Sequence, residues 1–195
     1  DSSSSRGLGD VYKRQNGASG LIQSAVIAMA SPGETILMPR NVHISVIKIC
    51  ALQNIQPIFF DLDFSLESGH YKPITKNWLE NVFKKINFNE KKIVGVILVS
   101  PSYHGYAGDL GPLIDLCHQK NLPVLVDEAH GSYFLFCENL NLPKSALISN
   151  ADLVVHSLHK SLNGLTQTAA LWYKGNLINE QNLIKSINLL QTTSP

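Results

Sequence analysis

Residues 92–100 read KIVGVILVS, a nearly unbroken run of aliphatic residues. A half-exposed strand alternates polar and apolar residues, whereas a continuous aliphatic run predicts a strand that is buried on both faces. Two later stretches have the same character, LPVLVDEAHG at 122–131 and ADLVVHS at 151–157. Residues 111–121, GPLIDLCHQKN, carry proline in what would be the first helical turn. The sequence therefore predicts an α/β fold with a mostly parallel sheet.

The same alternation of strand-like and helix-like segments extends over most of the chain. Residues 61–74 are expected to form a polar loop, and Thr75 is expected to cap the helix that follows. The other expected strands are 35–39, 55–62 and 168–174, and the other expected helices are 20–30, 43–54, 75–86 and 176–190.

Composition indicates one folded domain of an ordinary globular kind. The 195 residues are 44% hydrophobic and 16% charged, and no apolar run approaches the roughly 20 residues that span a bilayer. The three cysteines form no C-x-x-C pair, which favours a reducing compartment with buried thiols. We therefore expect a cytoplasmic protein without a membrane partner.

Residues 1–15, DSSSSRGLGDVYKRQ, differ in character from the rest. The stretch SRGLGDVYKRQ corresponds, codon by codon, to the translation of a transposon-based sequencing adapter. We therefore expect residues 1–15 to be foreign to the native protein and to lack a partner in the fold. Residues 16–195 are then part of a larger domain, whose own first strand would be missing.

The charge balance argues against a nucleic-acid partner. Residues 1–15 hold three of the 16 basic and two of the 15 acidic residues, so the remainder carries 13 of each. A net charge of zero gives no basic footprint for a phosphate backbone.

Three polar clusters are predicted at one edge of the sheet, where parallel strands end and ligands usually bind. NGASG at 16–20 precedes a helix, and its backbone N–H groups suit an anion such as a phosphate. Asp127 and Glu128 end one strand, with His130 close behind. HSLHK at 156–160 ends another. Taken singly, each cluster also suits an ordinary capped helix or a solvated strand end.

Two chemistries fit single clusters but not the whole pattern. D-E-A-H at 127–130 is typical of helicase-like ATPases, yet no G-x-x-x-x-G-K-[ST] phosphate loop precedes it. His156 and His159 are spaced for two metal ligands, but no cysteine or carboxylate completes a zinc set at matched spacing. We therefore expect neither an ATPase nor a metal site.

The remaining chemistry uses Lys160 as an amine that forms a Schiff base with a carbonyl. A phosphate cradle, then a strand-end aspartate, then a lysine about thirty residues later is the order found in pyridoxal 5′-phosphate enzymes. In that arrangement the aspartate keeps the cofactor's ring nitrogen protonated, and the lysine binds its aldehyde.

The chain resembles the fold-type I ornithine/lysine/arginine decarboxylases from Asn16 to Pro195. The resemblance rests on several stretches in the same order: NGASG, PRNVHIS, SPSYHGYAGDL, VLVDEAHGSYF, ADLVVHSLHKSLNGLTQTAAL and LLQTTSP. It implies a three-layer α/β/α sandwich, the aspartate aminotransferase-like large domain of PLP-dependent transferases.

The resemblance also implies roles for individual residues. Lys160 would bind the cofactor, Asp127 would pair with its ring nitrogen, and His43 would stack on its ring. The phosphate contacts would come from Ala18, Ser19, Gly20 and Ser157, and the surroundings of ring and lysine from His130 and His159. The family more often has a hydroxyl residue where Ala18 stands, so the contact there is expected from the backbone.

The resemblance further implies decarboxylation of lysine, ornithine or arginine by a homodimer or a higher homo-oligomer. An α-oxoamine synthase of the same fold is the main alternative, although SLHKSLNGLTQT fits the decarboxylases better. A homologue without catalytic activity is a further alternative. His70 and His118 are expected to be surface residues.

Overall fold

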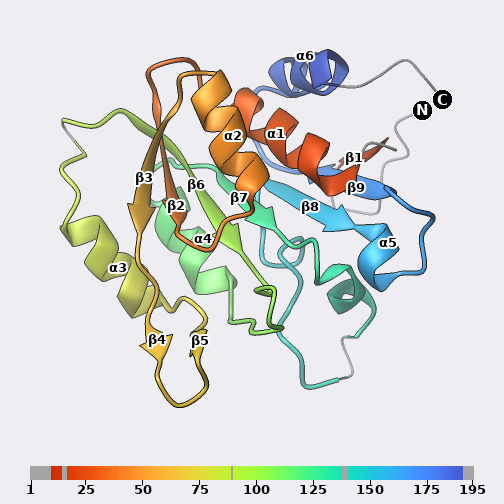
Figure 1. Ribbon diagram of the computed structural model, residues 1–195. Helices are drawn as coiled ribbons and strands as arrows, with labels where there is room; N and C mark the ends of the chain where they lie inside the picture. The colour runs from red at the N-terminus through yellow and green to blue at the C-terminus, as the bar shows by residue number, and fades with distance from the viewer. Residues whose placement is uncertain (1–9, 15–16, 89, 138–139, 191–195) are drawn as a thin grey trace.

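The computed structural model describes residues 10–14, 17–88, 90–137 and 140–190 (Figure 1). Its main feature is a seven-stranded sheet in the order β1-β9-β8-β7-β6-β2-β3. Neighbouring strands among β3, β2, β6, β7 and β8 run parallel, whereas β9 is antiparallel to both β8 and β1. The strands are β1 (Asp10–Arg14), β2 (Thr35–Pro39), β3 (Gln56–Phe60), β6 (Ile93–Val99), β7 (Val124–Asp127), β8 (Leu153–Ser157) and β9 (Ala169–Tyr173). The mostly parallel sheet of the sequence prediction is confirmed.

Helices cover both faces of this sheet, which gives three layers (Figure 1). One face carries α1, α2 and α6, whose apolar residues share a core cluster with Ile97 and Leu125. The other face carries α3 and α4, which share a second cluster with Leu98 and Val126. The helices are α1 (Gly17–Met29), α2 (Ile44–Leu52), α3 (Lys76–Lys84), α4 (Gly111–His118) and α6 (Glu180–Leu190). No helix in the described ranges is long and apolar enough to cross a membrane.

The two clusters explain why the central strands are continuously aliphatic. Successive side chains of a strand point to opposite faces, so both sets of alternate positions in β7 must be apolar. Val124, Leu125 and Val126 are all fully buried, although Leu125 belongs to one cluster and its neighbours to the other. Burial of such side chains stabilises the fold by about 1.5–3 kcal/mol each.

The structure adds elements that the sequence analysis did not predict. The loop at 61–74 contains a short hairpin of β4 (Phe64–Ser65) and β5 (His70–Tyr71). A 3-10 helix, η1 (Ser132–Phe136), follows β7, and a single turn, α5 (Leu158–Ser161), follows β8. The predicted cap is confirmed, since the Thr75 side chain accepts a hydrogen bond from the backbone N–H of Trp78 at 3.3 Å.

The start of the chain departs from the sequence expectation. We expected residues 1–15 to have no partner, but the backbone of β1 pairs with β9 along its whole length, from Asp10 opposite Tyr173 to Arg14 opposite Ala169. That expectation is therefore wrong for the backbone of β1. Residues 1–9 and 15 lie outside the described residues.

Candidate active site

The residues singled out from the sequence lie at the edge of the sheet where β2, β7 and β8 end. Asp127 is the last residue of β7, Ser157 is the last of β8, and His43 follows β2 at the start of α2. The start of α1 reaches the same edge, because Arg14 of β1 and Ser157 of β8 both pair with Ala169 of β9. Strand direction alone therefore gathers the three polar clusters of the sequence.

Lys160 and His130 are in direct contact. The single turn α5 follows β8 and carries Lys160, whose Nζ lies 3.2 Å from Nε2 of His130 in the loop after β7. Burial lowers the pKa of His130, and the positive charge of Lys160 lowers it further. The neutral ring can then accept a hydrogen bond from the lysine ammonium at Nε2. This pair joins the two strand ends across the site.

Asp127 is a buried carboxylate beside three basic side chains. It is 7% exposed, and its Oδ1 accepts a hydrogen bond from the backbone N–H of Ala129 at 3.1 Å. Burial raises the pKa of Asp127, against the opposing effects of that hydrogen bond and of the charges on His43, Lys160 and His130. Desolvation is the larger effect, so a further positive charge here would be stabilising.

His43 has a structural role as the cap of α2. Its Nδ1 caps α2 by accepting a hydrogen bond from the backbone N–H of Ser45 at 3.2 Å, and the same atom lies 2.8 Å from the Ser45 hydroxyl. The cap holds the ring at the end of β2, within electrostatic reach of Asp127. Capping and contact with a ligand are compatible here, because the cap uses Nδ1.

The start of α1 forms a cradle of small residues. Gly17 has a φ of 74°, a left-handed conformation that favours glycine, and its N–H donates to the carbonyl of Gln167 at 2.8 Å. That bond ties the helix start to the loop that follows Lys160. Ala18 is buried and Ser19 is exposed at the first turn, where backbone N–H groups lack helical partners.

Ser157 and His159 lie together beside this cradle. Ser157 is fully buried, and its Oγ is 3.3 Å from Nδ1 of His159. The same Nδ1 lies 3.3 Å from the carbonyl oxygen of Thr168. These contacts place His159 toward the loop that leads into β9, whereas Lys160 turns toward His130.

Two residues close to these positions were misjudged from the sequence. The sequence predicts Glu128 and His156 within polar strand ends, but both are almost completely buried, and His156 Nε2 lies 2.7 Å from Glu128 Oε2. His118, which the sequence places at the surface, is partly exposed, and its Nε2 also lies 2.8 Å from Oδ2 of buried Asp152. The sequence contains one signal that separates His156 from the site. Side chains alternate along a strand, so His156 and its neighbour Ser157 point to opposite faces of the sheet.

The aromatic loop after β6 approaches the site from one side. Tyr103 makes an edge-on ring contact with His130 at 5.6 Å between centroids. His104 stacks on His70 of the β4–β5 hairpin at 4.2 Å. Tyr103 is largely exposed, so its contact with His130 lies at the surface of the site.

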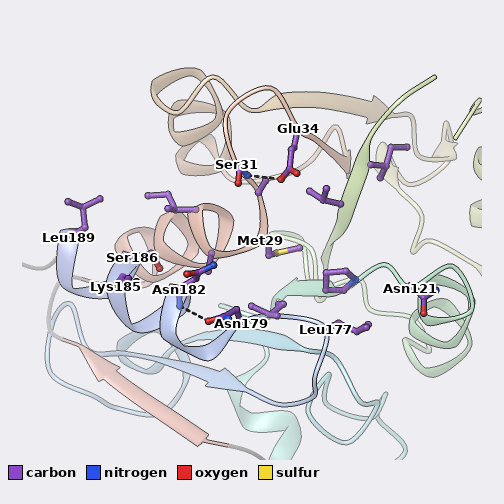
Figure 2. Close-up of a pocket in the computed structure, with 17 residues that line it drawn as sticks. Met29, Ser31, Glu34, Asn121, Leu177, Asn179, Asn182, Lys185, Ser186 and Leu189 are labelled. Atoms are coloured by element: carbon purple, nitrogen blue, oxygen red, sulfur yellow. Dashed lines mark hydrogen bonds between the residues drawn. The ribbon is translucent and has the colours of Figure 1, made fainter. Parts of the chain in front are cut away.

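A cavity of about 760 Å³ lies elsewhere (Figure 2). It is bounded by the end of α1, by α6, and by Ile93 and Pro123 at the beginnings of β6 and β7. The beginnings of parallel strands face the edge opposite to Lys160. This cavity is therefore separate from the candidate active site.

The side chains at the strand ends fit pyridoxal 5′-phosphate better than a metal ion. No group of three or more metal-ligating side chains occurs among the described residues. The site instead offers three features. The start of α1 has small residues that suit a phosphate, and Lys160 has a primary amine. Burial raises the pKa of the Asp127 carboxyl group, so a further positive charge beside it would be stabilising. Those three features correspond to the cofactor's phosphate, aldehyde and protonated ring nitrogen.

Comparison with known proteins identifies the family. The family model for the major domain of Orn/Lys/Arg decarboxylases matches residues 8–195. The chain belongs to this family. An arginine decarboxylase of Bacillus cereus is 36% identical over 178 residues, which is 91% of this chain and 37% of that protein. The chain thus spans little more than a third of the length of this curated relative.

Solved structures show the same fold. The lysine decarboxylase of Francisella novicida superposes with a TM-score of 0.75 at 21% identity, over 96% of this chain and 27% of that one. An aspartate aminotransferase of Thermotoga maritima gives a TM-score of 0.65 at 18% identity, over 92% and 45%. The aspartate aminotransferase-like fold expected from the sequence is confirmed.

Proposed function

We propose that the full-length protein is a pyridoxal 5′-phosphate-dependent decarboxylase of a basic amino acid: lysine, ornithine or arginine. The observation that carries the proposal is the placement of Lys160 against His130, both within electrostatic reach of buried Asp127. Membership of the Orn/Lys/Arg decarboxylase family supports the reaction class.

The cofactor, when bound, would supply an electron sink that accepts the electron pair left when CO₂ departs. Asp127 would hold the positive charge of the ring nitrogen, which strengthens that sink. Ala18, Ser19 and Gly20 would bind the phosphate through the start of α1, together with Ser157. His43 would lie against the ring, held in place by its cap on α2.

Proton movement falls to the basic side chains of the site. Lys160 is the amine that the substrate's amino group would displace from the cofactor. Once displaced, it can carry the proton that replaces CO₂ on the α-carbon, and His130 lies at hydrogen-bond distance to exchange that proton. His159, beside Ser157, would complete the surroundings of lysine and phosphate.

The substrate and assembly are the finer parts of the proposal. The relative from Bacillus cereus is named an arginine decarboxylase, so arginine is the first substrate to test. We expect the protein to act as a homodimer or a higher homo-oligomer in the cytoplasm. An α-oxoamine synthase of the same fold is the alternative activity, and it would join the amino acid to an acyl thioester to give an α-amino ketone rather than agmatine or a diamine.

The direct test is covalent trapping of the cofactor. The full-length protein is incubated with pyridoxal 5′-phosphate, reduced with borohydride and digested, and the modified peptide is identified by mass spectrometry. We expect the adduct on Lys160 and its loss in Lys160→Ala, whereas Lys120→Ala, which changes an exposed lysine, keeps it. An adduct on another lysine would refute the assignment. The same preparation is then assayed for CO₂ release from arginine, lysine and ornithine.

A further inference from the structure

A buried hydrogen-bond network lies directly beneath the candidate active site. The Glu128 carboxylate accepts from the backbone N–H of Ala146 at 2.8 Å and from the Ser145 hydroxyl at 2.7 Å. Nε2 of His156 is 2.7 Å from the same carboxylate, and Nδ1 of His156 is 3.0 Å from Nε1 of Trp172. Glu128 and His156 are 0% and 1% exposed, so water does not compete for these bonds.

The donors and acceptors of this network have one consistent arrangement. Indole N–H groups only donate, so Nδ1 of His156 accepts from Trp172. The ring hydrogen is then on Nε2, where it donates to Glu128. The Glu128 carboxylate thus accepts from three defined donors: the Ser145 hydroxyl, the Ala146 N–H and the His156 Nε2–H. The network is therefore satisfied, and each of its bonds has a fixed direction. A fully satisfied buried network of this kind is rigid.

The network occupies the point where the ladder between β7 and β8 ends. Asp127 pairs with Val155, and the N–H of Glu128 donates to the carbonyl of Val155 at 3.0 Å. The bond between Glu128 and His156 therefore continues the strand pairing by side chains, one residue beyond the ladder.

The next residues on each strand carry the site. Asp127 immediately precedes Glu128, and Ser157 immediately follows His156. Because side chains alternate along a strand, Asp127 and Ser157 lie on the face of α1, and Glu128 and His156 lie on the opposite face. The network thus lies on the face opposite to Asp127 and Ser157, and it is linked to them through the backbone of the two strand ends.

From this geometry we propose that Glu128 and His156 are positioning residues that fix the end of β7, with Asp127, relative to the end of β8, with Ser157 and Lys160. The inference rests on the proposed function, because the groups so fixed are those assigned to the cofactor. Loss of the network would misplace the ring partner relative to the phosphate and the lysine. The first effect would be weaker cofactor binding and a lower kcat, with KM for the amino acid little changed.

The chain contains a matched control at the opposite end of the same strand. Asp152, immediately before β8, accepts from the backbone N–H of Val124 at 2.8 Å and lies 2.8 Å from Nε2 of His118. The imidazole–carboxylate pair here joins α4 to the residue before β8, and the same carboxylate bonds the start of β7, at the edge away from Lys160. His118→Ala therefore removes an imidazole–carboxylate bond of similar length, in a more exposed setting, without touching the site.

The test compares His156→Ala with His118→Ala in the full-length protein. The dissociation constant of pyridoxal 5′-phosphate is measured by titration of the absorbance of the bound cofactor, alongside kcat, KM and the thermal midpoint. We expect His156→Ala to weaken cofactor binding by about tenfold, the factor for one hydrogen bond to a charged group. We expect His118→Ala to lower the midpoint while cofactor affinity and kcat stay within about twofold. His156→Gln, whose amide supplies one donor and one acceptor, should restore much of the affinity.

The outcomes separate this inference from the proposed function. If the unmodified protein binds no cofactor, the proposed function fails, and the inference falls with it. If the unmodified protein binds and His156→Ala binds equally well, or if His118→Ala weakens binding just as much, the positioning role is refuted and the function stands. If His156→Ala does not fold, Glu128→Gln is compared with His118→Ala instead. Glutamine keeps the shape of the side chain, but its amide N–H₂ group cannot accept a hydrogen bond and so faces one of the donors unpaired.

Discussion

Replacement of Asp127 by asparagine should abolish most of the decarboxylase activity while it preserves the fold. Asparagine has nearly the same shape, and its Oδ1 can still accept the N–H of Ala129 that Asp127 accepts at 3.1 Å. What is lost is one negative charge at a position that is 7% exposed, where solvent screens weakly. Two unit charges about 4 Å apart interact by about 4 kcal/mol at an effective dielectric constant of about 20. Since about 1.4 kcal/mol is a factor of ten, the charge accounts for at most about three orders of magnitude.

Part of that interaction is shared with neighbouring basic side chains. His43, Lys160 and His130 already act on the Asp127 carboxylate, so we expect kcat to fall by about two to three orders of magnitude. The assay is CO₂ release at saturating arginine and cofactor, with circular dichroism to verify folding. Asp115→Asn, which removes an exposed carboxylate from α4, is the matched control and should keep full activity. An Asp127→Asn protein that keeps more than about a third of the wild-type kcat would show that the carboxylate does not support the ring nitrogen.

Two further predictions concern stability and thiol chemistry. Burial raises the pKa of Asp127 above its value in the unfolded chain, so its contribution to stability is fully present below about pH 4 and is lost as the pH rises through the folded-state pKa. In the cofactor-free protein, Asp127→Asn should therefore raise the thermal midpoint at pH 7 and have little effect near pH 3; a lower midpoint at pH 7 would contradict this. Burial also raises the pKa of Cys50 to about 11 and that of Cys117 to about 12. Iodoacetamide at pH 8 should thus alkylate half-buried Cys137 first, as peptide mapping would show, whereas the denatured protein should react at all three.

The sequence was sufficient for the central sheet because its strands are buried on both faces. Aliphatic runs such as 93–99 and 124–126 have few alternatives to a central parallel strand, and the structure has β6 and β7 there. The β4–β5 hairpin was not predictable in the same way. Its strands are two residues long and largely solvent-accessible, so the sequence has no apolar periodicity there that would predict the pairing of Phe64 with Tyr71.

The site was predictable where topology alone brings residues together. Asp127 and Lys160 follow parallel strands, so their closeness follows from strand direction. The partners of Glu128 were not predictable, because Ser145 and Ala146 come from an irregular segment whose path depends on tertiary packing. The third cysteine illustrates the same limit, since Cys137 was expected to be buried and is only half-buried.

The backbone pairing of β1 with β9 is compatible with a foreign origin of residues 1–15. Ladder bonds join main-chain atoms, so a foreign stretch without proline can occupy the place of a native strand beside β9. The match of the family model from residue 8 onward is likewise compatible with a short foreign segment at its margin. The match of SRGLGDVYKRQ to the translated adapter therefore still predicts that these eleven residues are absent from the native gene. Amplification of the locus from source DNA, without adapters, should return different codons before Asn16. Recovery of the same eleven codons would refute the adapter origin and make β1 a native strand of the sheet.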